Sequence, residues 1–351
     1  MKTAENIILL GDVCLTHYDK ITAQNSIHSI FDGVKKIADD SLVFGNFECV
    51  FPEKDAKANL SKISLGASES FIKELQFFDG LCLSNNHIED FGIESVIHTK
   101  KLLDQAGISN FGYEADINQA RTPFLFKLAD KTVAILSYSC LTTNGENYAG
   151  QSRPGVVALA PEYVEEDYVK AKAAGADMVI ASIHWGIENT HYPTKDQIAV
   201  AHRIIDCGVD FIWGNHAHAI QGMELYNGKW IAYGLGNFLF SDIPIEFGRA
   251  GKIQKTILKQ HDLNLESVGI KLGINPKTNL FEIKEKYYFS LKKDFLPSLV
   301  EPQEQTINLS NLNKHISAYV ANNSFELKCD LNIRQRFNGN NYQNVYDNPV
   351  I

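Results

Sequence analysis

The sequence predicts an α/β protein, because short apolar runs typical of strands alternate with helical patterns over the first 240 residues. Its 351 residues allow one large α/β domain with additions or two modest domains. With 44% hydrophobic and 21% charged residues, the chain has the composition of a folded protein rather than a disordered one. We expect a main domain over residues 1–260 and a C-terminal extension over residues 261–351.

The individual elements follow from apolar spacing and from the residues that end each pattern. Strands are expected over residues 7–10, 42–44, 81–83, 110–113, 178–183 and 209–212. Helices are expected over residues 26–39, 69–78, 93–105, 161–174 and 195–207. Hairpins are expected within residues 124–136, around Asn227-Gly228 and within residues 268–291, followed by a helix over residues 309–322 and an irregular tail.

Composition and missing motifs exclude several classes of protein. Thirty-three basic and 42 acidic residues give a net charge of -9, which disfavours nucleic acids and anionic membrane surfaces as partners. The sequence has no P-loop and no GxSxG motif, so ATP-driven ligation and acyl-enzyme chemistry are also disfavoured. No apolar run is long enough to span a bilayer and the start does not resemble a secretory signal, so we expect a cytoplasmic protein without direct membrane insertion.

Polar residues follow five of the expected strands, at the edge where open α/β sheets collect their ligands. The five segments are Gly11-Asp12, Gly45-Asn46-Phe47-Glu48, Ser84-Asn85-Asn86-His87, Ile183-His184-Trp185-Gly186 and Trp213-Gly214-Asn215-His216-Ala217-His218. Taken singly, each has an ordinary explanation, such as a helix cap or a hydrogen-bonded core histidine. Taken together they predict one pocket, and carboxylate, amide and imidazole groups suit Zn²⁺, Mn²⁺ or Fe²⁺.

Two of these segments carry the strongest signal. Glu48 is surrounded by apolar residues, and a carboxylate in such a place needs a partner to offset its desolvation. His216 and His218 would present both imidazoles on one face if their segment is extended.

The ordered motifs GD, GNFE, NNH, HWG and GNHAH, followed by Tyr233-Gly234-Leu235-Gly236-Asn237-Phe238, resemble the CapA, or poly-γ-glutamate capsule, family of bacterial capsule-synthesis proteins. The resemblance covers roughly residues 5 to 240. That family is similar in fold to the calcineurin-like metallophosphoesterases. The resemblance therefore implies a four-layer α-β-β-α sandwich of two mixed sheets, with the pocket at one edge and a small C-terminal extension.

The resemblance also implies roles for individual residues. It assigns one or two divalent ions to Asp12, Glu48, Asn86, His184, His216 and His218. Asp12, Glu48 and His87 would be catalytic, with Glu48 able to bridge two ions and His87 able to protonate a leaving group. The sequence departs from the phosphoesterases at Cys14, where they carry histidine, and at Glu48, where they carry aspartate.

Three further residues are candidate substrate contacts. Arg153 could anchor an anion, and Glu188 and Asn237 could touch the substrate. A surface arginine, a turn carboxylate and a loop-capping asparagine explain them about as well.

The function expected from these features is metal-dependent hydrolysis in capsule or cell-surface polymer synthesis. The bond would be a phosphoester or a γ-glutamyl amide, in an anionic polymer or a small anionic precursor. The alternative is a non-catalytic polymer-binding or assembly subunit that keeps the fold, which the departure at Cys14 motivates. Other capsule-synthesis proteins are candidate partners.

Overall fold

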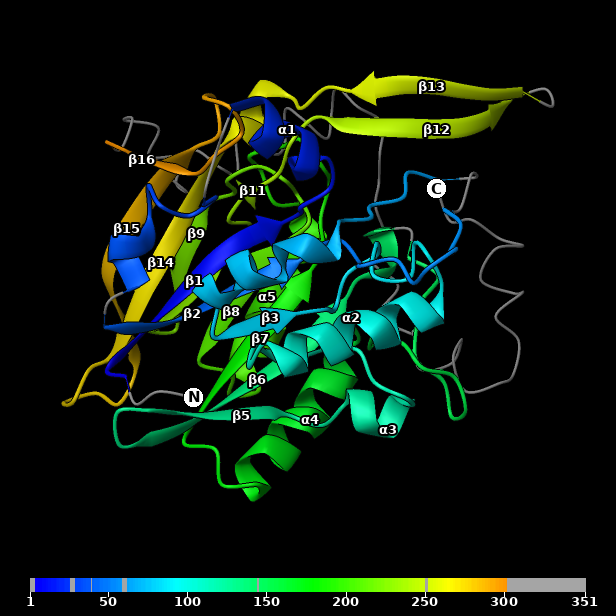
Figure 1. Cartoon of the computed structure of the whole chain (residues 1–351). Helices are drawn as coiled ribbons and strands as arrows, with labels where there is room; N and C mark the ends of the chain where they lie inside the picture. The colour runs from blue at the N-terminus through cyan, green and yellow to red at the C-terminus, as the bar shows by residue number, and fades with distance from the viewer. Residues whose placement is uncertain are drawn as a thin grey trace.

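The centre of the protein is formed by two mixed β-sheets (Figure 1). The computed structural model describes residues 4–25, 29–38, 40–58, 62–143, 145–249 and 252–301. The first sheet has the order β16-β15-β14-β1-β2-β3-β4, with β11 also paired to β1, and the second has the order β5-β6-β7-β8-β10-β9. The strands of the first sheet are β1 (Asn6–Val13), β2 (Ser41–Phe47), β3 (Gly80–Cys82), β4 (Ser109–Phe111), β11 (Asn237–Leu239), β14 (Glu266–Ile274), β15 (Phe281–Ser290) and β16 (Ser298–Val300).

The second sheet and the helices complete the described part of the chain. The strands of the second sheet are β5 (Phe124–Leu128), β6 (Lys131–Ser139), β7 (Met178–His184), β8 (Phe211–Asn215), β9 (Met223–Tyr226) and β10 (Lys229–Ala232). A separate hairpin pairs β12 (Ile243–Arg249) with β13 (Lys252–Leu258). The α-helices are α1 (Tyr18–Asn25), α2 (Ile93–Gln105), α3 (Ile117–Ala120), α4 (Pro161–Ala173) and α5 (Lys195–Asp206).

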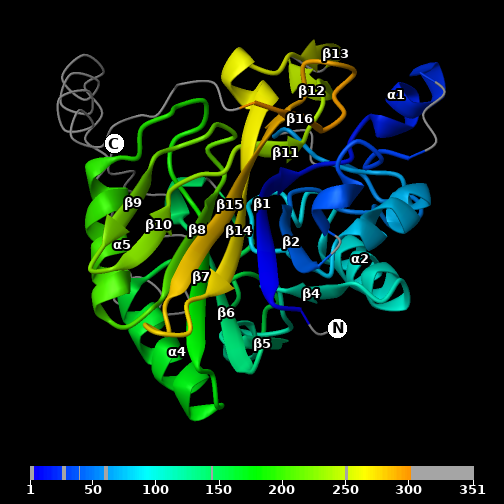
Figure 2. The ribbon, with the colours of Figure 1, turned by 90° about the vertical axis from the view of Figure 1, so that its left-hand side faces the viewer.

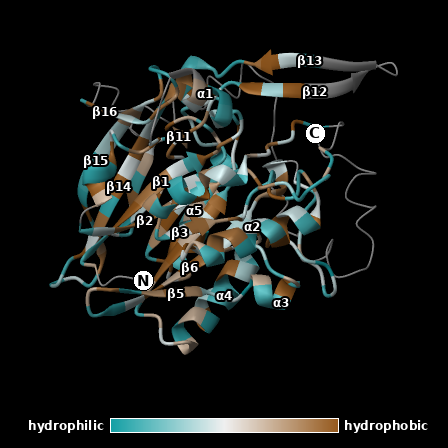
Figure 3. Ribbon diagram, in the orientation of Figure 1, coloured by the Kyte–Doolittle hydropathy of each residue, from teal (hydrophilic) through white to brown (hydrophobic). Residues whose placement is uncertain are grey.

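Three groups of buried apolar side chains separate four layers. Between the two sheets, Ile7 and Leu9 of β1 belong to the same buried group as Ile180 of β7. The alternate residues of β1 face the other way, so Ile8 and Leu10 pack in the group that includes α2. A third group joins the outer face of the second sheet to α4 and α5. The central strands are hydrophobic and the outer faces of the helices are more polar (Figure 3). The expected four-layer α-β-β-α sandwich is confirmed.

α4 and α5 begin at the expected residues, Pro161 and Lys195, and each start has a local cause. Pro161 occupies the first turn of α4, where its missing N–H removes no helical bond. Thr194 caps α5 by accepting from the backbone N–H of Gln197, whose side chain accepts in turn from Thr194. These local signals gave α4 and α5 their correct starting points.

Several expected elements were wrong or incomplete. Residues 29–38 form turns and a short 3₁₀ segment (Lys35–Ala38) rather than a helix, although Ile30, Phe31 and Val34 are buried. Their spacing reflects burial of a turn, not helical periodicity. The segment expected as a helix over residues 69–78 is 3₁₀ (Glu69–Phe77), and α1 and the β12–β13 hairpin were not predicted.

The expected C-terminal hairpin belongs to the first sheet. β14 pairs antiparallel with β1, with Ile7 opposite Leu272, and β15 pairs with β14. The division into domains at residues 260 and 261 stays a prediction. The helix expected over residues 309–322 and the irregular tail lie outside the described residues. None of the described helices combines the length and the apolar character needed to cross a bilayer.

Candidate metal centre

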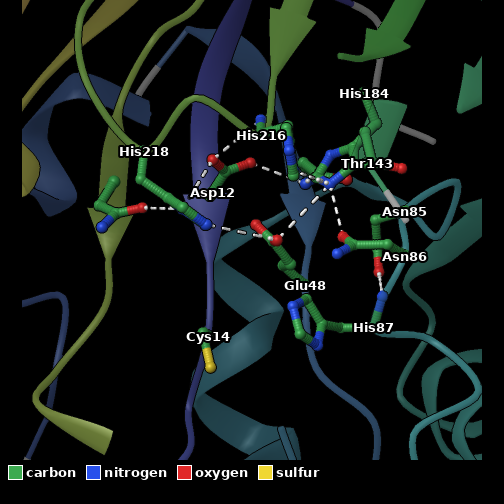
Figure 4. Close-up of polar contacts among 12 residues, drawn as sticks. Asp12, Cys14, Glu48, Asn85, Asn86, His87, Thr143, His184, His216 and His218 are labelled. Carbon is green, nitrogen blue, oxygen red and sulfur yellow. Dashed lines mark hydrogen bonds and ion pairs between the residues drawn. The ribbon is translucent and has the colours of Figure 1, made fainter. Parts of the chain in front are cut away.

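The five polar segments meet at one edge of the sandwich (Figure 4). In the first sheet, the parallel pairing of β1 and β2 sets Asp12 beside Asn46, and Glu48 follows directly. In the second sheet, the parallel pairing of β7 and β8 sets His184 beside Asn215, and His216 follows. The two sheets are joined close to this edge by Trp213, whose indole N–H donates to the Leu10 carbonyl at 3.0 Å.

Glu48 lies at the centre of the cluster with both carboxylate oxygens unsatisfied. The residue is fully buried, and neither oxygen has a hydrogen-bond partner among the described residues. Nε2 of His184 lies 3.5 Å from Oε1, and Nε2 of His218 lies 3.7 Å from the same oxygen. Burial and then the charge of Asp12 raise the pKa of Glu48 well above its usual value. Two buried carboxylate oxygens without hydrogen-bond partners among the described residues would be stabilised by a bound cation.

Asp12 is held from both sheets. Its Oδ1 accepts from Nδ2 of Asn46 at 2.7 Å, and its Oδ2 accepts from the backbone N–H of His216 at 3.2 Å. Nδ1 of His218 lies 3.5 Å from the same Oδ2. The strand that carries Asp12 runs very close to its neighbour, because a Cβ added at Gly11 would lie 1.8 Å from the Gly236 carbonyl oxygen. Glycine is therefore required before this aspartate.

His216 and His218 converge through an unusual backbone rather than an extended one. Their φ angles are 90° and 55°, in the left-handed region that side-chain-bearing residues seldom occupy. The segment is not extended, so that condition is not met, yet the two rings lie 6.0 Å apart between centroids. Such strain is typical of sites where the surrounding structure fixes a side chain for a purpose.

The imidazoles differ in charge. Burial lowers the pKa of His184 to about 3 and holds that of His216 well below its usual value, so both rings are neutral and able to ligate a metal. Burial also disfavours the charged form of His218, but the carboxylates of Glu48 and Asp12 outweigh it and raise the pKa to about 10. Nε2 of His184 and Nδ1 of His216 are 3.1 Å apart.

Two overlapping sets of possible ligand atoms result. Asp12, Glu48 and His184 form one set, and Glu48, His216 and His218 form the other. Within each set the ligand atoms all lie within 4.8 Å of one another. Glu48 belongs to both sets. The donor set of carboxylates and imidazoles fits Zn²⁺, Mn²⁺ or Fe²⁺, and the arrangement has room for one or two ions.

Asn86 and His87 come from the loop after β3. Oδ1 of Asn86 lies 2.9 Å from Nε2 of His184, which brings this amide to the cluster. Asn85 fixes the loop, since its side chain donates to the Phe47 carbonyl and accepts from the backbone N–H of His87. His87 stands at the edge of the cluster, below Glu48 in Figure 4.

Sequence reasoning missed two supporting residues. Asn46 donates to Asp12 and lies 3.3 Å from Nδ1 of His184, so it orients members from both sheets. Asp90, whose side chain is fully buried, lies 2.7 Å from Nδ1 of His87 through its Oδ2, and its Oδ1 pairs with Lys62. The spacing of three residues between His87 and Asp90 could have indicated this contact, because a turn brings such side chains together.

Cys14 does not join the cluster. Its side chain is buried and points away from the carboxylates in Figure 4, and its thiol donates to Thr16 Oγ1 at 3.3 Å. This position behaves as a small buried thiol, as the sequence suggested.

The three candidate substrate contacts have different surroundings. Asn237 is fully buried, and its Oδ1 lies 2.9 Å from Nδ1 of His218, so its position suits orienting that ring rather than touching substrate. Glu188 is exposed, on a loop tied to the histidine segment by the Asn189 N–H and the Ala217 carbonyl. Arg153 donates to Glu89 at 2.9 Å and to two backbone carbonyls, so most of its hydrogen-bonding capacity is engaged.

Comparison with known proteins defines the class. The sequence model of the bacterial capsule synthesis protein PGA_cap family matches residues 6–242, and the chain belongs to this family. It is 32% identical over 238 residues to the PGA biosynthesis protein CapA of Bacillus subtilis (strain 168), an alignment that covers 66% of this chain and 62% of that protein. It is 29% identical over 243 residues to the capsule biosynthesis protein CapA of Bacillus anthracis, covering 66% and 59%. The chain thus spans about three fifths of the length of these curated relatives.

Other similarities are more partial or more distant. A probable polyglutamine synthesis accessory protein of Mycobacterium tuberculosis (strain CDC 1551 / Oshkosh) is 34% identical over 164 residues, covering 44% of this chain and 43% of that protein. Among solved structures, the calcineurin-like phosphoesterase YfkN of Bacillus subtilis matches with a TM-score of 0.47 and 15% identity, covering 90% of this chain and 98% of that one. At this level of similarity, YfkN bears on neither the substrate nor the reaction of this chain.

Proposed function

We propose that this member of the PGA_cap family is a divalent-metal-dependent hydrolase in the synthesis of capsule or another cell-surface polymer. The substrate would be an anionic polymer or a small anionic precursor, and the bond a phosphoester or a γ-glutamyl amide. The names of the two Bacillus relatives, in PGA biosynthesis and capsule biosynthesis, support the polymer class. The observation that carries the metal-dependent reaction is the fully buried Glu48, which lies beside carboxylate and imidazole ligands and whose two oxygens have no hydrogen-bond partner in the described part of the chain.

The ion or ions would be held by the convergent side chains from both sheets. The proposed ligands are Asp12, Glu48, Asn86, His184, His216 and His218. A divalent cation there supplies positive charge for a phosphoryl or carbonyl oxygen and makes water more acidic. Since the chain carries a net charge of -9, a local cation also accounts for how an anionic substrate could approach.

His87 would act as the acid or base at the edge of this cluster. Oδ2 of Asp90 accepts from Nδ1 of His87, which fixes the ring orientation and leaves proton transfer to the other ring nitrogen, Nε2. Asp12 and Glu48 would contribute to the reaction by holding the cation.

Two charged residues and the other capsule-synthesis proteins are the candidate substrate contacts and partners. Exposed Glu188 lies within electrostatic reach of Glu48 and His218, so it is the candidate contact at the rim. Arg153 would reach an anion only if it gave up its bond to Glu89. Other capsule-synthesis proteins are the proposed partners, in keeping with the accessory role in the mycobacterial relative's name. A cytoplasmic location stays a prediction.

Metal content and turnover together test this function. The purified protein should contain Zn, Mn or Fe by elemental analysis, and it should hydrolyse poly-γ-glutamate or a phosphoester in a way that chelator abolishes and Mn²⁺ or Zn²⁺ restores. His87→Ala should lower turnover by about 10²- to 10⁴-fold while metal content stays the same. His98→Ala is the matched control, because His98 lies on α2, its side chain bonds to Glu69, and its loss should change neither quantity. Full turnover by metal-free protein, or by His87→Ala, would refute the proposal.

A non-catalytic polymer-binding subunit is the second candidate, and the orientation of Cys14 favours it. The thiol points away from the cluster, so the chain lacks a ligand at the position where the phosphoesterases have histidine. Under this alternative, poly-γ-glutamate should bind equally well with and without chelator, and no hydrolysis should be seen at any metal concentration.

A further inference from the structure

Two thiols meet next to the candidate metal centre. Cys14 comes two residues after Asp12, just past the end of β1, and Cys49 directly follows Glu48, just past the end of β2. The two thiols hydrogen-bond to each other, and Cys49 Sγ also accepts from the backbone N–H of Leu15 at 3.4 Å. Since β1 and β2 are parallel neighbours, the two cysteines follow adjacent strands at the same edge of the first sheet. Figure 2 shows these two strands side by side.

The contact between these thiols distinguishes them from two other described cysteines. Cys82 accepts from the Ser182 hydroxyl at 3.6 Å, and the Cys207 thiol donates to a backbone carbonyl at 3.0 Å. Cys207 is partly exposed, whereas Cys14 and Cys49 are at most 1% exposed. Two thiols that already touch need only a small movement to form a disulfide, in which the Cβ atoms lie about 3.5–4.5 Å apart.

A cavity reaches the residue next to this pair. Oγ1 of Thr16 accepts from the Cys14 thiol at 3.3 Å, and Thr16 also lines a cavity with a volume of about 290 Å³. Lys20, which is exposed, lines the same cavity, so solvent enters it. The side chain of Thr16 therefore separates the Cys14 thiol from solvent, and a small oxidant has to pass only this residue.

We propose that Cys14 and Cys49 are an oxidation site, at which hydrogen peroxide converts the two thiols into a reversible disulfide. One sulfur bonds to a peroxide oxygen as the O–O bond breaks, which gives a sulfenic acid and releases water. The second thiol then displaces the hydroxyl group of the sulfenic acid, so that the S–S bond forms and a second water leaves. The two sulfurs together lose two electrons, which the peroxide accepts. A dithiol reductant reverses the change.

A disulfide at this position would displace a candidate metal ligand. The S–S bond is about 2.05 Å long, much shorter than the separation of two hydrogen-bonded thiols, so Cys14 and Cys49 approach each other as it forms. Glu48 is joined directly to Cys49, and its backbone N–H donates to the Val13 carbonyl at 2.9 Å, so the movement is passed to Glu48. A metal site tolerates shifts of only about 0.2 Å in its ligand distances. Oxidation should therefore weaken metal binding, and bound metal should disfavour the disulfide by the same factor.

This inference goes beyond the proposed function, because it concerns two thiols that the hydrolytic reaction does not use. The disulfide is detected without metal and without turnover. Its absence is therefore distinguishable from a failure of the proposed function.

Peptide mapping of the full chain tests the disulfide. Protein in chelator is treated with hydrogen peroxide, the remaining thiols are alkylated, and linked peptides are identified by mass spectrometry. We expect a link between Cys14 and Cys49 that dithiothreitol removes and that forms before Cys207 is oxidised. Absence of this link once Cys207 is oxidised would overturn the proposal, and so would a link from either cysteine to a different one in its place.

Mn²⁺ titrations of the reduced and the oxidised protein test the effect on the metal centre. Affinity should fall about tenfold on oxidation and return after reduction. Equal affinity of the two forms would refute the displacement of Glu48.

Cysteine variants identify which thiols are responsible. Cys14→Ser should bind Mn²⁺ as the reduced parent does and should keep this affinity after peroxide, and Cys49→Ser gives the same test if Cys14→Ser does not fold. Cys207→Ser is the matched control, because Cys207 lies at the end of α5 and its loss should leave both the link and the fall in affinity unchanged. A fall in affinity after peroxide in the Cys14 and Cys49 variants would mean that another oxidation is the cause, and it would overturn the proposal.

Discussion

Replacing Glu48 by glutamine should stabilise the metal-free protein and weaken its response to metal. The parent carboxylate is fully buried without a hydrogen-bond partner among the described residues, and it faces the charge of Asp12. Because the folded protein disfavours the ionised form and raises the pKa of Glu48, replacing it with an uncharged amide of the same shape should raise the free energy of unfolding by about 2 kcal/mol at neutral pH. With an unfolding entropy of about 2.1 cal mol⁻¹ K⁻¹ per residue, this corresponds to a rise in Tm of roughly 3 °C for 351 residues.

Metal should stabilise the parent protein much more than the Glu48→Gln variant. A ligand at one hundred times its Kd stabilises the folded state by about 2.7 kcal/mol, so Mn²⁺ or Zn²⁺ should raise the Tm of the parent by roughly 4 °C. The Glu48→Gln variant lacks the carboxylate shared by both ligand sets and should gain little from metal. Thermal unfolding in chelator and in excess metal measures both effects on the same samples.

Glu89→Gln provides the matched control for this prediction. Glu89 is largely buried like Glu48, but its oxygens bond to the Tyr113 hydroxyl at 2.8 Å and to Arg153 at 2.9 Å. Losing this charge-assisted bond should lower stability by about 2 kcal/mol and leave the metal response intact. If metal-free Glu48→Gln is less stable than the parent, or if its metal response is undiminished, Glu48 is not an unsatisfied metal ligand and the reasoning fails.

Other substitutions test the support around the centre and the core. Asn237→Ala removes the acceptor that orients the His218 ring and should weaken metal binding about 10- to 100-fold in a metal titration; unchanged affinity would remove its positioning role. Gly11→Ala forces β1 against the Gly236 carbonyl and should abolish soluble expression, and a normally folded variant would contradict the close approach. Arg121→Leu removes one partner of the buried Asp167 carboxylate, which keeps Lys170 and the Tyr138 hydroxyl, and should cost about 1 to 3 kcal/mol in chemical denaturation; an unchanged stability would mean that these two partners are sufficient.

Local patterns were sufficient for the elements that bury one regular face or carry a specific cap. The Pro161 start of α4 and the Thr194 cap of α5 are short-range signals, and both helices begin where those signals lie. The helix predicted over residues 26–39 is not formed around Ile30, because a buried turn can repeat apolar residues at helical intervals without forming a helix. Tertiary packing decided that segment, and the sequence alone does not contain its partners.

Some features of the candidate site were likewise predictable from the sequence, and others were not. That Asp12, Glu48, His184 and His216 share a pocket was predictable, since parallel strands bring their carboxyl ends to one edge. The roles of Asn46, Asp90 and Asn237 were not, because a hydrogen bond across the fold depends on where two distant side chains come to rest. The same holds for Cys14, whose orientation only the packing around β1 determines.

The sequence by itself determined the alternation of strands and helices, the chemical types of the site residues and their order along the chain, because these depend on neighbours within a few positions. Only the tertiary structure decided that the Glu48 carboxylate has no hydrogen-bond partner among the described residues, and that His216 and His218 converge through left-handed backbone. Those features arise from contacts between residues far apart in the chain. Their energies depend on burial, which no local pattern specifies.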